Sequence, residues 1–67
     1  MRLLINGKPI EAPEGHTLGE VLTFIGIEDC RGVAVAVDGE IVPRGVWGIM
    51  ALEEGQSIEV VRAVQGG

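Results

Sequence analysis

The chain has 67 residues, enough for one small domain whose core is too small to enclose an active site. Its formal charge is −5, and its five basic residues are scattered, which argues against nucleic acid as a partner. The negative charge suits a basic protein partner or simple solubility. With 46% hydrophobic residues the chain is too apolar for disorder. Its longest apolar run, residues 33–37, cannot span a membrane, and the first residues do not resemble a signal peptide, so we expect a cytoplasmic protein.

The first predicted element is a β-hairpin. Residues 2–6 form its first strand, and Asn6-Gly7 is a strong turn signal, because both central residues of a type I′ turn need positive φ. The return strand is predicted over residues 8–12, and Pro13, Glu14 and Gly15 end it.

A helix follows the hairpin. Thr17 and Glu20 are spaced as a capping box, in which each side chain accepts a hydrogen bond from the other residue's backbone amide. Gly26 is predicted to end the helix in the left-handed conformation. One apolar stripe at helical spacing lies between these signals: Leu18, Val21, Leu22 and Ile25.

The second half of the chain predicts another hairpin and a last strand. Residues 33–37 form a strand, Asp38-Gly39 a turn, and residues 40–42 a short strand stopped by Pro43. A compact connection with one helical turn around Val46-Trp47 then leads to a strand beginning at Ile58.

The final strand leads to Gly66-Gly67. Glycine is costly to order and packs no side chain, so this pair suggests a tail that threads into another molecule. The alternative is an ordinary frayed terminus. We expect one domain over residues 1–67, with residues 64–67 as its flexible tail.

The order hairpin, helix, hairpin, connection, strand predicts an α+β fold of the β-grasp, ubiquitin-like type. Its mixed five-stranded sheet has the order 2-1-5-3-4 and packs on one helix, with the final strand parallel to the first and between the first and third. Alternation along the strands turns one set of residues toward the helix: Leu3, Ile5, Val33, Val35, Val37, Ile58 and Val60. A second set faces away and forms a predicted docking face beside the tail: Leu4, Ala34, Ala36, Val61 and Ala63. The alternative is an ordinary surface with a few apolar residues.

Several segments resemble one known family. They are Asn6 at the first turn, Thr17 and Leu22 in the helix, the run from Val33 to Arg44 with Trp47 after it, Leu52-x-x-Gly55-x-x-Ile58-Glu59, and Gly66-Gly67. Together they resemble the sulfur carrier proteins of thiamine synthesis, the ThiS family, over nearly the whole chain. Gln56 departs from the family pattern, where an aspartate is usual, and we expect it to affect only a local turn hydrogen bond. Gln65 before the glycine pair is a second departure, with no expected consequence.

The resemblance implies that the Gly67 carboxylate is the reacting group and that this chain is a substrate, not an enzyme. An adenylyltransferase of the ubiquitin-activating type would adenylate it with ATP and Mg²⁺, while Val64, Gln65 and Gly66 lie in its cleft. A sulfur donor such as a cysteine desulfurase would supply the sulfur of a thiocarboxylate, which thiazole synthase would use. The resemblance implies no cofactor or metal bound by this chain.

Other functions stay open at this point. The chain could be a sulfur carrier of another pathway, such as the small subunit of molybdopterin synthase, a ubiquitin-like protein modifier, or an interaction module with an idle tail. Arg44 and Arg62 could pair with carboxylates of a partner or simply be solvated. Trp47 is interpreted as a packing residue, Cys30 as an inert cysteine, and His16 as a residue at the helix entry.

Overall fold

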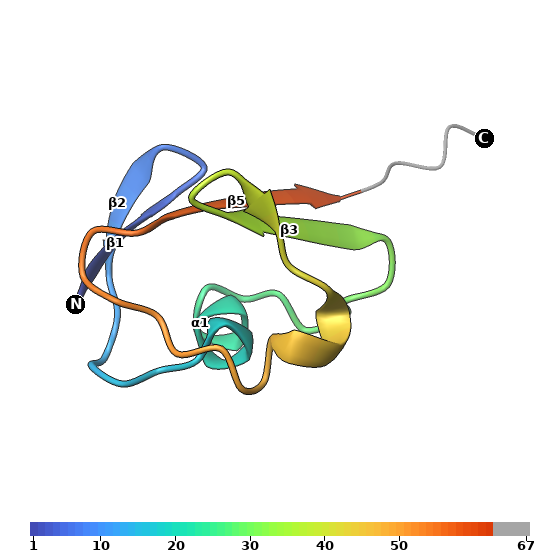
Figure 1. Ribbon diagram of the computed structural model, residues 1–67, viewed down its shortest axis with the longest axis horizontal. Coiled ribbons are helices and arrows are strands. Elements are labelled where there is room, and N and C mark those ends of the chain that lie inside the picture. The colour runs from blue at the N-terminus through green and yellow to red at the C-terminus, as the bar shows by residue number, and fades with distance from the viewer. Residues whose placement is uncertain (63–67) are drawn as a thin grey trace.

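The structure is a computed structural model that describes residues 1–62 (Figure 1). The end of the predicted last strand and the predicted tail, residues 63–67, lie outside the described residues. The elements in chain order are β1 (Arg2–Ile5), β2 (Lys8–Glu11), α1 (Leu18–Phe24), β3 (Val33–Val37), β4 (Glu40–Ile41), the 3₁₀ helix η1 (Arg44–Val46) and β5 (Ser57–Arg62). Within the described part of the chain, no helix has the length and apolar character needed to cross a membrane.

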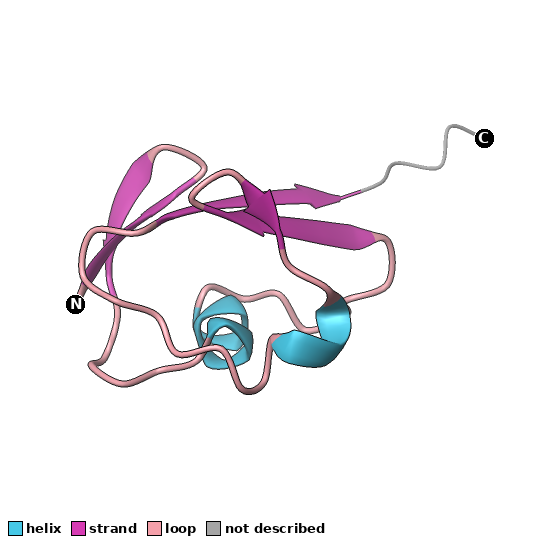
Figure 2. Ribbon diagram, in the orientation of Figure 1, coloured by secondary structure: helices cyan, strands magenta, loops and turns pink. Residues whose placement is uncertain are grey.

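The strands form a five-stranded sheet in the order β2-β1-β5-β3-β4. β1 and β5 are parallel neighbours, and the other adjacent pairs are antiparallel. Both α1 and η1 lie on the same side of the sheet, and no helix formed by residues 1–62 covers the other side (Figure 2). This is the predicted β-grasp arrangement, with the last strand in the middle of the sheet. We call the side away from α1 the outer face.

The two hairpin turns adopt the backbone that their sequences predict. Asn6 and Asp38 have φ values of 50° and 49°, and the glycine that follows each of them also has a positive φ. β1 therefore ends at Ile5, one residue before the predicted limit. Both turn residues also reach β5. The Asn6 side chain pairs with the backbone of Val60, and the Asp38 carboxylate accepts from the backbone N–H of Ser57 at 2.9 Å.

The helix begins with the predicted capping box. The Thr17 hydroxyl accepts from the Glu20 N–H at 3.2 Å, and the Glu20 carboxylate accepts from the Thr17 N–H at 2.9 Å. The backbone N–H groups of Leu18 and Gly19, the first two residues of α1, donate to carbonyl groups of the segment after η1. The first turn of α1 is thereby joined to that segment, and Gly26 at φ 95° follows the helix as predicted.

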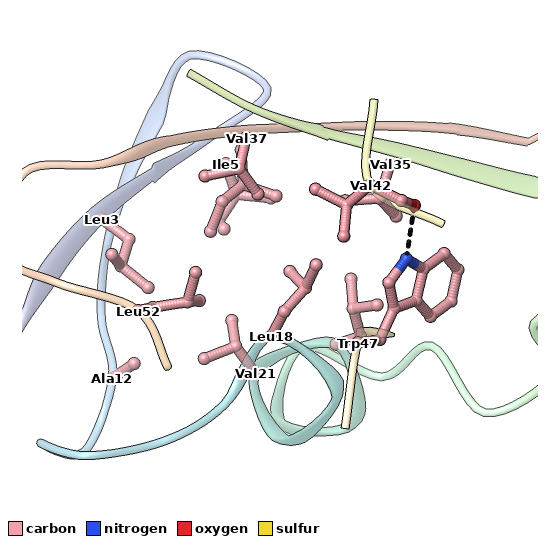
Figure 3. Close-up of a cluster of buried hydrophobic side chains, with 12 residues drawn as sticks. Leu3, Ile5, Ala12, Leu18, Val21, Val35, Val37, Val42, Trp47 and Leu52 are labelled. Carbon is pink, nitrogen blue, oxygen red and sulfur yellow. Dashed lines mark hydrogen bonds between the residues drawn. The ribbon is translucent and has the colours of Figure 1, made fainter. Parts of the chain in front are cut away.

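The core lies between the inner side of the sheet and α1 (Figure 3). Trp47 is 5% exposed, and its indole Nε1 donates to the Val42 carbonyl at 2.9 Å. This confirms the interpretation of Trp47 as a packing residue. Of the residues predicted to face inward, Val33 and Val60 are half-buried and the others are buried: Leu3, Ile5, Val35, Val37 and Ile58.

Further local predictions need correction. β2 ends at Glu11, one residue before the predicted limit, and β5 begins at Ser57, one residue earlier than predicted. β4 ends at Ile41 and not at residue 42, although the Val42 N–H still donates to the Val35 carbonyl at 2.9 Å. The helical turn begins earlier than expected, at Arg44. The Gln56 side chain does more than hold its own turn. Its Oε1 accepts from the Glu53 N–H at 2.8 Å, and its Nε2 donates to the Asp38 carboxylate at 3.3 Å, which links two turns distant in sequence.

Candidate functional site

The outer face has the apolar character that strand alternation predicts. Leu4 and Val61 are 38% and 63% exposed, Ala34 is also exposed, and Ala36 is half-buried. Ala63, the fifth residue predicted for this face, lies outside the described residues. β1, β5 and β3 are neighbours in the sheet, so the four described residues share one surface.

Part of this surface is a shallow hollow of about 300 Å³, which we call the outer hollow. It is lined by residues from β3, β4, β5 and the turn between β3 and β4: Ala34, Ala36, Gly39, Ile41, Glu59 and Val61. The strand register explains its shape. Ala36 pairs with Ile41 on one side and Glu59 on the other, so the small alanine lies between two larger side chains.

Ile41 is the residue that sequence reasoning missed on this face. It is 72% exposed, more than Val61, and it lines the hollow opposite β5. The Asp38-Gly39 turn contained the necessary signal. A two-residue turn fixes the pairing of Ile41 with Ala36, and residues paired across an antiparallel ladder point to the same face.

The lining of the outer hollow is mostly apolar. Small and branched apolar side chains line most of it, and among the lining residues that the structure describes Glu59 is the one ionisable group. Exposed apolar surface of this kind commonly marks a contact with another protein. Leu4 lies outside the lining of the hollow, although β1 is adjacent to β5. The docking role of these residues remains a prediction.

Other polar residues singled out in the sequence have ordinary local surroundings. His16 Nδ1 lies 3.8 Å from a carboxylate oxygen of Glu20, beside the capping box. The pKa of Glu20 is lowered chiefly by the hydrogen bond from the Thr17 backbone N–H, with a smaller contribution from His16. Cys30 is half-buried against the core. Within residues 1–62, no three His, Cys, Asp or Glu side chains are grouped so as to hold a metal ion.

The predicted reacting residue Gly67, and Val64, Gln65 and Gly66 before it, lie outside the described residues. The structure nevertheless shows the residues that precede them. β5 ends at Arg62, one residue after Val61 of the outer hollow. The outer hollow therefore lies directly beside the strand that leads toward residues 63–67.

The strand order, with one α-helix packed on the sheet, places the chain among the ubiquitin-like β-grasp proteins. The family model described as "ThiS family" matches residues 3–67. The chain belongs to the ThiS family.

Individual relatives agree with this assignment. The "Sulfur carrier protein ThiS" of Escherichia coli is 28% identical over 67 residues, which cover all of both chains. A crystal structure of a thiamine biosynthesis protein (ThiS) from Geobacter metallireducens matches with a TM-score of 0.82 and 26% identity, again covering all of both chains.

Two larger proteins contain a similar segment. Proteins named thiazole synthase from Magnetococcus marinus and Paramagnetospirillum magneticum are 37% and 34% identical to this chain over 67 residues. The match covers the whole of this chain but only 20% of each thiazole synthase.

Proposed function

We propose that this chain carries sulfur as a thiocarboxylate on Gly67 and delivers it for formation of the thiazole ring of thiamine. The observation that supports this most directly is the family match, which extends through residue 67 and so includes the glycine pair. Within this proposal ATP and Mg²⁺ belong to an activating enzyme, and the chain itself binds neither.

The proposed chemistry has two steps. An oxygen of the Gly67 carboxylate attacks the α-phosphorus of ATP, and pyrophosphate leaves. This activation is needed because a free carboxylate is a poor electrophile, whereas the adenylate has AMP as a leaving group. A sulfur nucleophile such as hydrosulfide then attacks the carbonyl carbon, and AMP leaves together with a proton. The net change is the replacement of one carboxylate oxygen by sulfur.

The sequence of the tail suits this chemistry. Glycine has no Cβ, so Gly66 and Gly67 can enter a narrow nucleotide site that other residues would obstruct. The five residues after Arg62 span at most about 18 Å when fully extended. The β-grasp body would thus stay outside the active site, and its outer face would dock at the entrance.

Thiazole synthase is the proposed sulfur acceptor. The two relatives of that name contain a segment similar to the whole of this chain, which supports a functional association between a domain of this kind and that enzyme. A cysteine desulfurase is the proposed sulfur source, and the cytoplasm the proposed compartment.

The test is a reconstituted reaction followed by intact mass. The purified chain is incubated with ATP, sulfide and an activating enzyme of the thiamine type, and the product is alkylated. A product with one oxygen replaced by sulfur, alkylated at Gly67, is expected. Alkylation is needed because addition of oxygen gives nearly the same mass. A chain that stays unmodified while a control carrier reacts would contradict the proposal.

The docking role of the outer face is tested with a matched pair of variants. Val61→Glu places a charge beside the outer hollow. Ile49→Glu makes the same kind of change in the connection between η1 and β5, at a residue that is 80% exposed. Val61→Glu is expected to raise the KM for the carrier about tenfold or more, because an interface would bury an unpaired charge, while Ile49→Glu stays near wild type. Equal effects of the two substitutions would exclude the outer face as the docking surface.

A further inference from the structure

The carboxylate of Asp29 is paired with one arginine and feels the charges of two more. Arg31 forms a bidentate ion pair with Asp29, with distances of 3.1 and 3.0 Å. The pKa of Asp29 is lowered mainly by this hydrogen-bonded pair, and the charges of Arg62 and Arg44 lower it further. These residues come from the loop before β3, from η1 and from β5, whose ends lie at the same end of the molecule (Figure 1). We call Arg31, Arg44, Arg62 and Asp29 the arginine end.

The arginine end and the outer hollow lie on opposite sides of β5. Val61 lines the outer hollow. Side chains two residues apart on a strand point to the same side, so Arg62 points to the helix side together with Ile58 and Val60. The effect of Arg62 on the pKa of Asp29 agrees with this orientation. The last two residues of β5 thus present an apolar group on one side and a basic group on the other.

The charge of this end differs from that of the rest of the chain. The arginine end holds three of the five basic residues and one of the ten acidic residues, which leaves two basic and nine acidic residues elsewhere. If Glu28, the neighbour of Asp29, is added, this end still has three basic residues against two acidic ones. An acidic surface is therefore repelled by most of the molecule and attracted at the end of β5.

Arg44 and Arg62 are available to a partner. Both are exposed, and no carboxylate of residues 1–62 lies within 4.0 Å of either guanidinium. Arg31 differs, because it is already paired with Asp29. The guanidinium groups of Arg44 and Arg62 can each bind a carboxylate with two parallel hydrogen bonds.

We infer that the partner cleft that receives residues 63–67 has an asymmetric entrance, with acidic side chains on the rim that meets Arg44 and Arg62 and apolar side chains on the rim that meets Val61 and the outer hollow. This inference rests on the proposed function, which supplies the reason for a cleft. The proposed contact of Arg62 with the acidic rim lies away from the reacting Gly67 carboxyl group. Five residues lie between Arg62 and the Gly67 carboxyl group, so Arg62 remains at the entrance when the tail is extended. The overall negative charge alone would have favoured a basic partner, whereas the local arrangement selects acidic groups at this end.

The test compares charge variants of the chain in binding to the activating enzyme. Arg62→Glu and Arg44→Glu reverse the proposed contacts, and Arg62→Gln removes one without adding repulsion. Lys8→Glu is the matched control, because Lys8 is exposed on the edge strand β2, which β1 separates from β5. Thermal unfolding and circular dichroism establish that each variant is folded.

Each reversal is expected to weaken binding about tenfold at low salt, and Arg62→Gln about threefold, mainly through the association rate. The losses shrink as ionic strength rises, because salt screens exposed charges. Lys8→Glu is expected to bind like wild type. Replacing an acidic rim residue of the enzyme by lysine is expected to restore binding of Arg62→Glu.

The outcomes separate the two proposals. If wild-type chain gains sulfur at Gly67 but Arg62→Glu and Arg44→Glu bind like Lys8→Glu, only the asymmetric entrance is overturned. If the variants keep their enzyme affinity and instead raise the KM for ATP, the arginines bind nucleotide phosphate, and the acidic rim is again overturned. If wild-type chain neither binds nor reacts while a control carrier does, the proposed function fails and this inference fails with it.

Discussion

The side-chain amide of Asn6 pairs with both backbone groups of Val60. Its Oδ1 accepts from the Val60 N–H at 2.8 Å, and its Nδ2 donates to the Val60 carbonyl at 3.3 Å. The backbone ladder between β1 and β5 ends where the Asn6 N–H donates to the Ile58 carbonyl at 2.8 Å, because the chain turns away at Asn6. The asparagine side chain then continues the pairing by one more step, toward the end of β5.

Substitutions at Asn6 separate its two roles. Asn6→Gly keeps the positive φ and removes the pairing, so we expect a loss of about 1 kcal/mol in unfolding free energy. Asn6→Ala also strains the turn and is expected to cost about 1 kcal/mol more. Hydrogen exchange should show a specific increase at the Val60 amide in both variants. An unchanged Val60 exchange rate in Asn6→Gly would show that the pairing contributes nothing to the order of β5.

Asp38 is the counterpart of Asn6 in the second turn. Its carboxylate accepts from the Ser57 N–H and from Gln56 Nε2. Asp38→Gly keeps the positive φ and removes both bonds, so a loss of about 1–2 kcal/mol is expected in urea unfolding. Asp38→Asn retains an acceptor for Ser57 and is the control. If the two variants are equally stable, the Ser57 bond is not the stabilising contact.

Trp47 combines a buried ring with one buried hydrogen bond. Trp47→Phe retains most of the ring but leaves the Val42 carbonyl without its indole donor, so we expect a loss of about 2 kcal/mol. Trp47→Ala leaves a cavity and is expected to cost about 3–5 kcal/mol. Thermal unfolding gives both values. A Phe variant as stable as wild type would mean that water replaces the indole N–H.

The acid stability of the chain depends in part on Glu20. Because the pKa of Glu20 is lowered in the folded state from its ordinary value of 4.5, its contribution is fully present above that pH. It is lost as pH falls through the lower folded pKa, where the carboxylate becomes protonated. Glu20→Gln can still cap the Thr17 amide and does not titrate. Its unfolding free energy should therefore fall less steeply than that of wild type below about pH 4.5, as measured by urea titrations at stepped pH. Identical slopes would exclude Glu20 as a contributor.

Most of the fold could be predicted from local signals. The Asn6-Gly7 and Asp38-Gly39 turns, the capping box and the alternation in β3 each depend on neighbouring residues. Together they leave few arrangements other than the observed sheet. The predicted limits of β1 and β4 were less accurate, because strand ends depend on turn geometry and tertiary contacts that hydrophobic periodicity does not encode.

The parts that could not be predicted depend on residues far apart in sequence. Nothing near Asn6 indicates that its amide pairs with Val60, and nothing near Gln56 indicates a bond to Asp38. The outer face was partly predictable from alternation, but the contribution of Ile41 required the register of β4. The influence of Arg44 and Arg62 on Asp29 could be seen only in the three-dimensional fold.

The central position of β5 affects when the domain can form during synthesis. β5 is the last described strand to be made, yet it separates β1 from β3, and its pairing joins Leu4 to Ser57 across most of the chain. Until β5 is in place, the chain can form only two separate hairpins and a short helix, without the sheet that would bury their apolar sides. Folding is therefore expected to wait for the segment that leads directly to Gly67, the proposed reacting residue. A partner that recognises the folded body would accept only chains in which that segment is present and correctly paired.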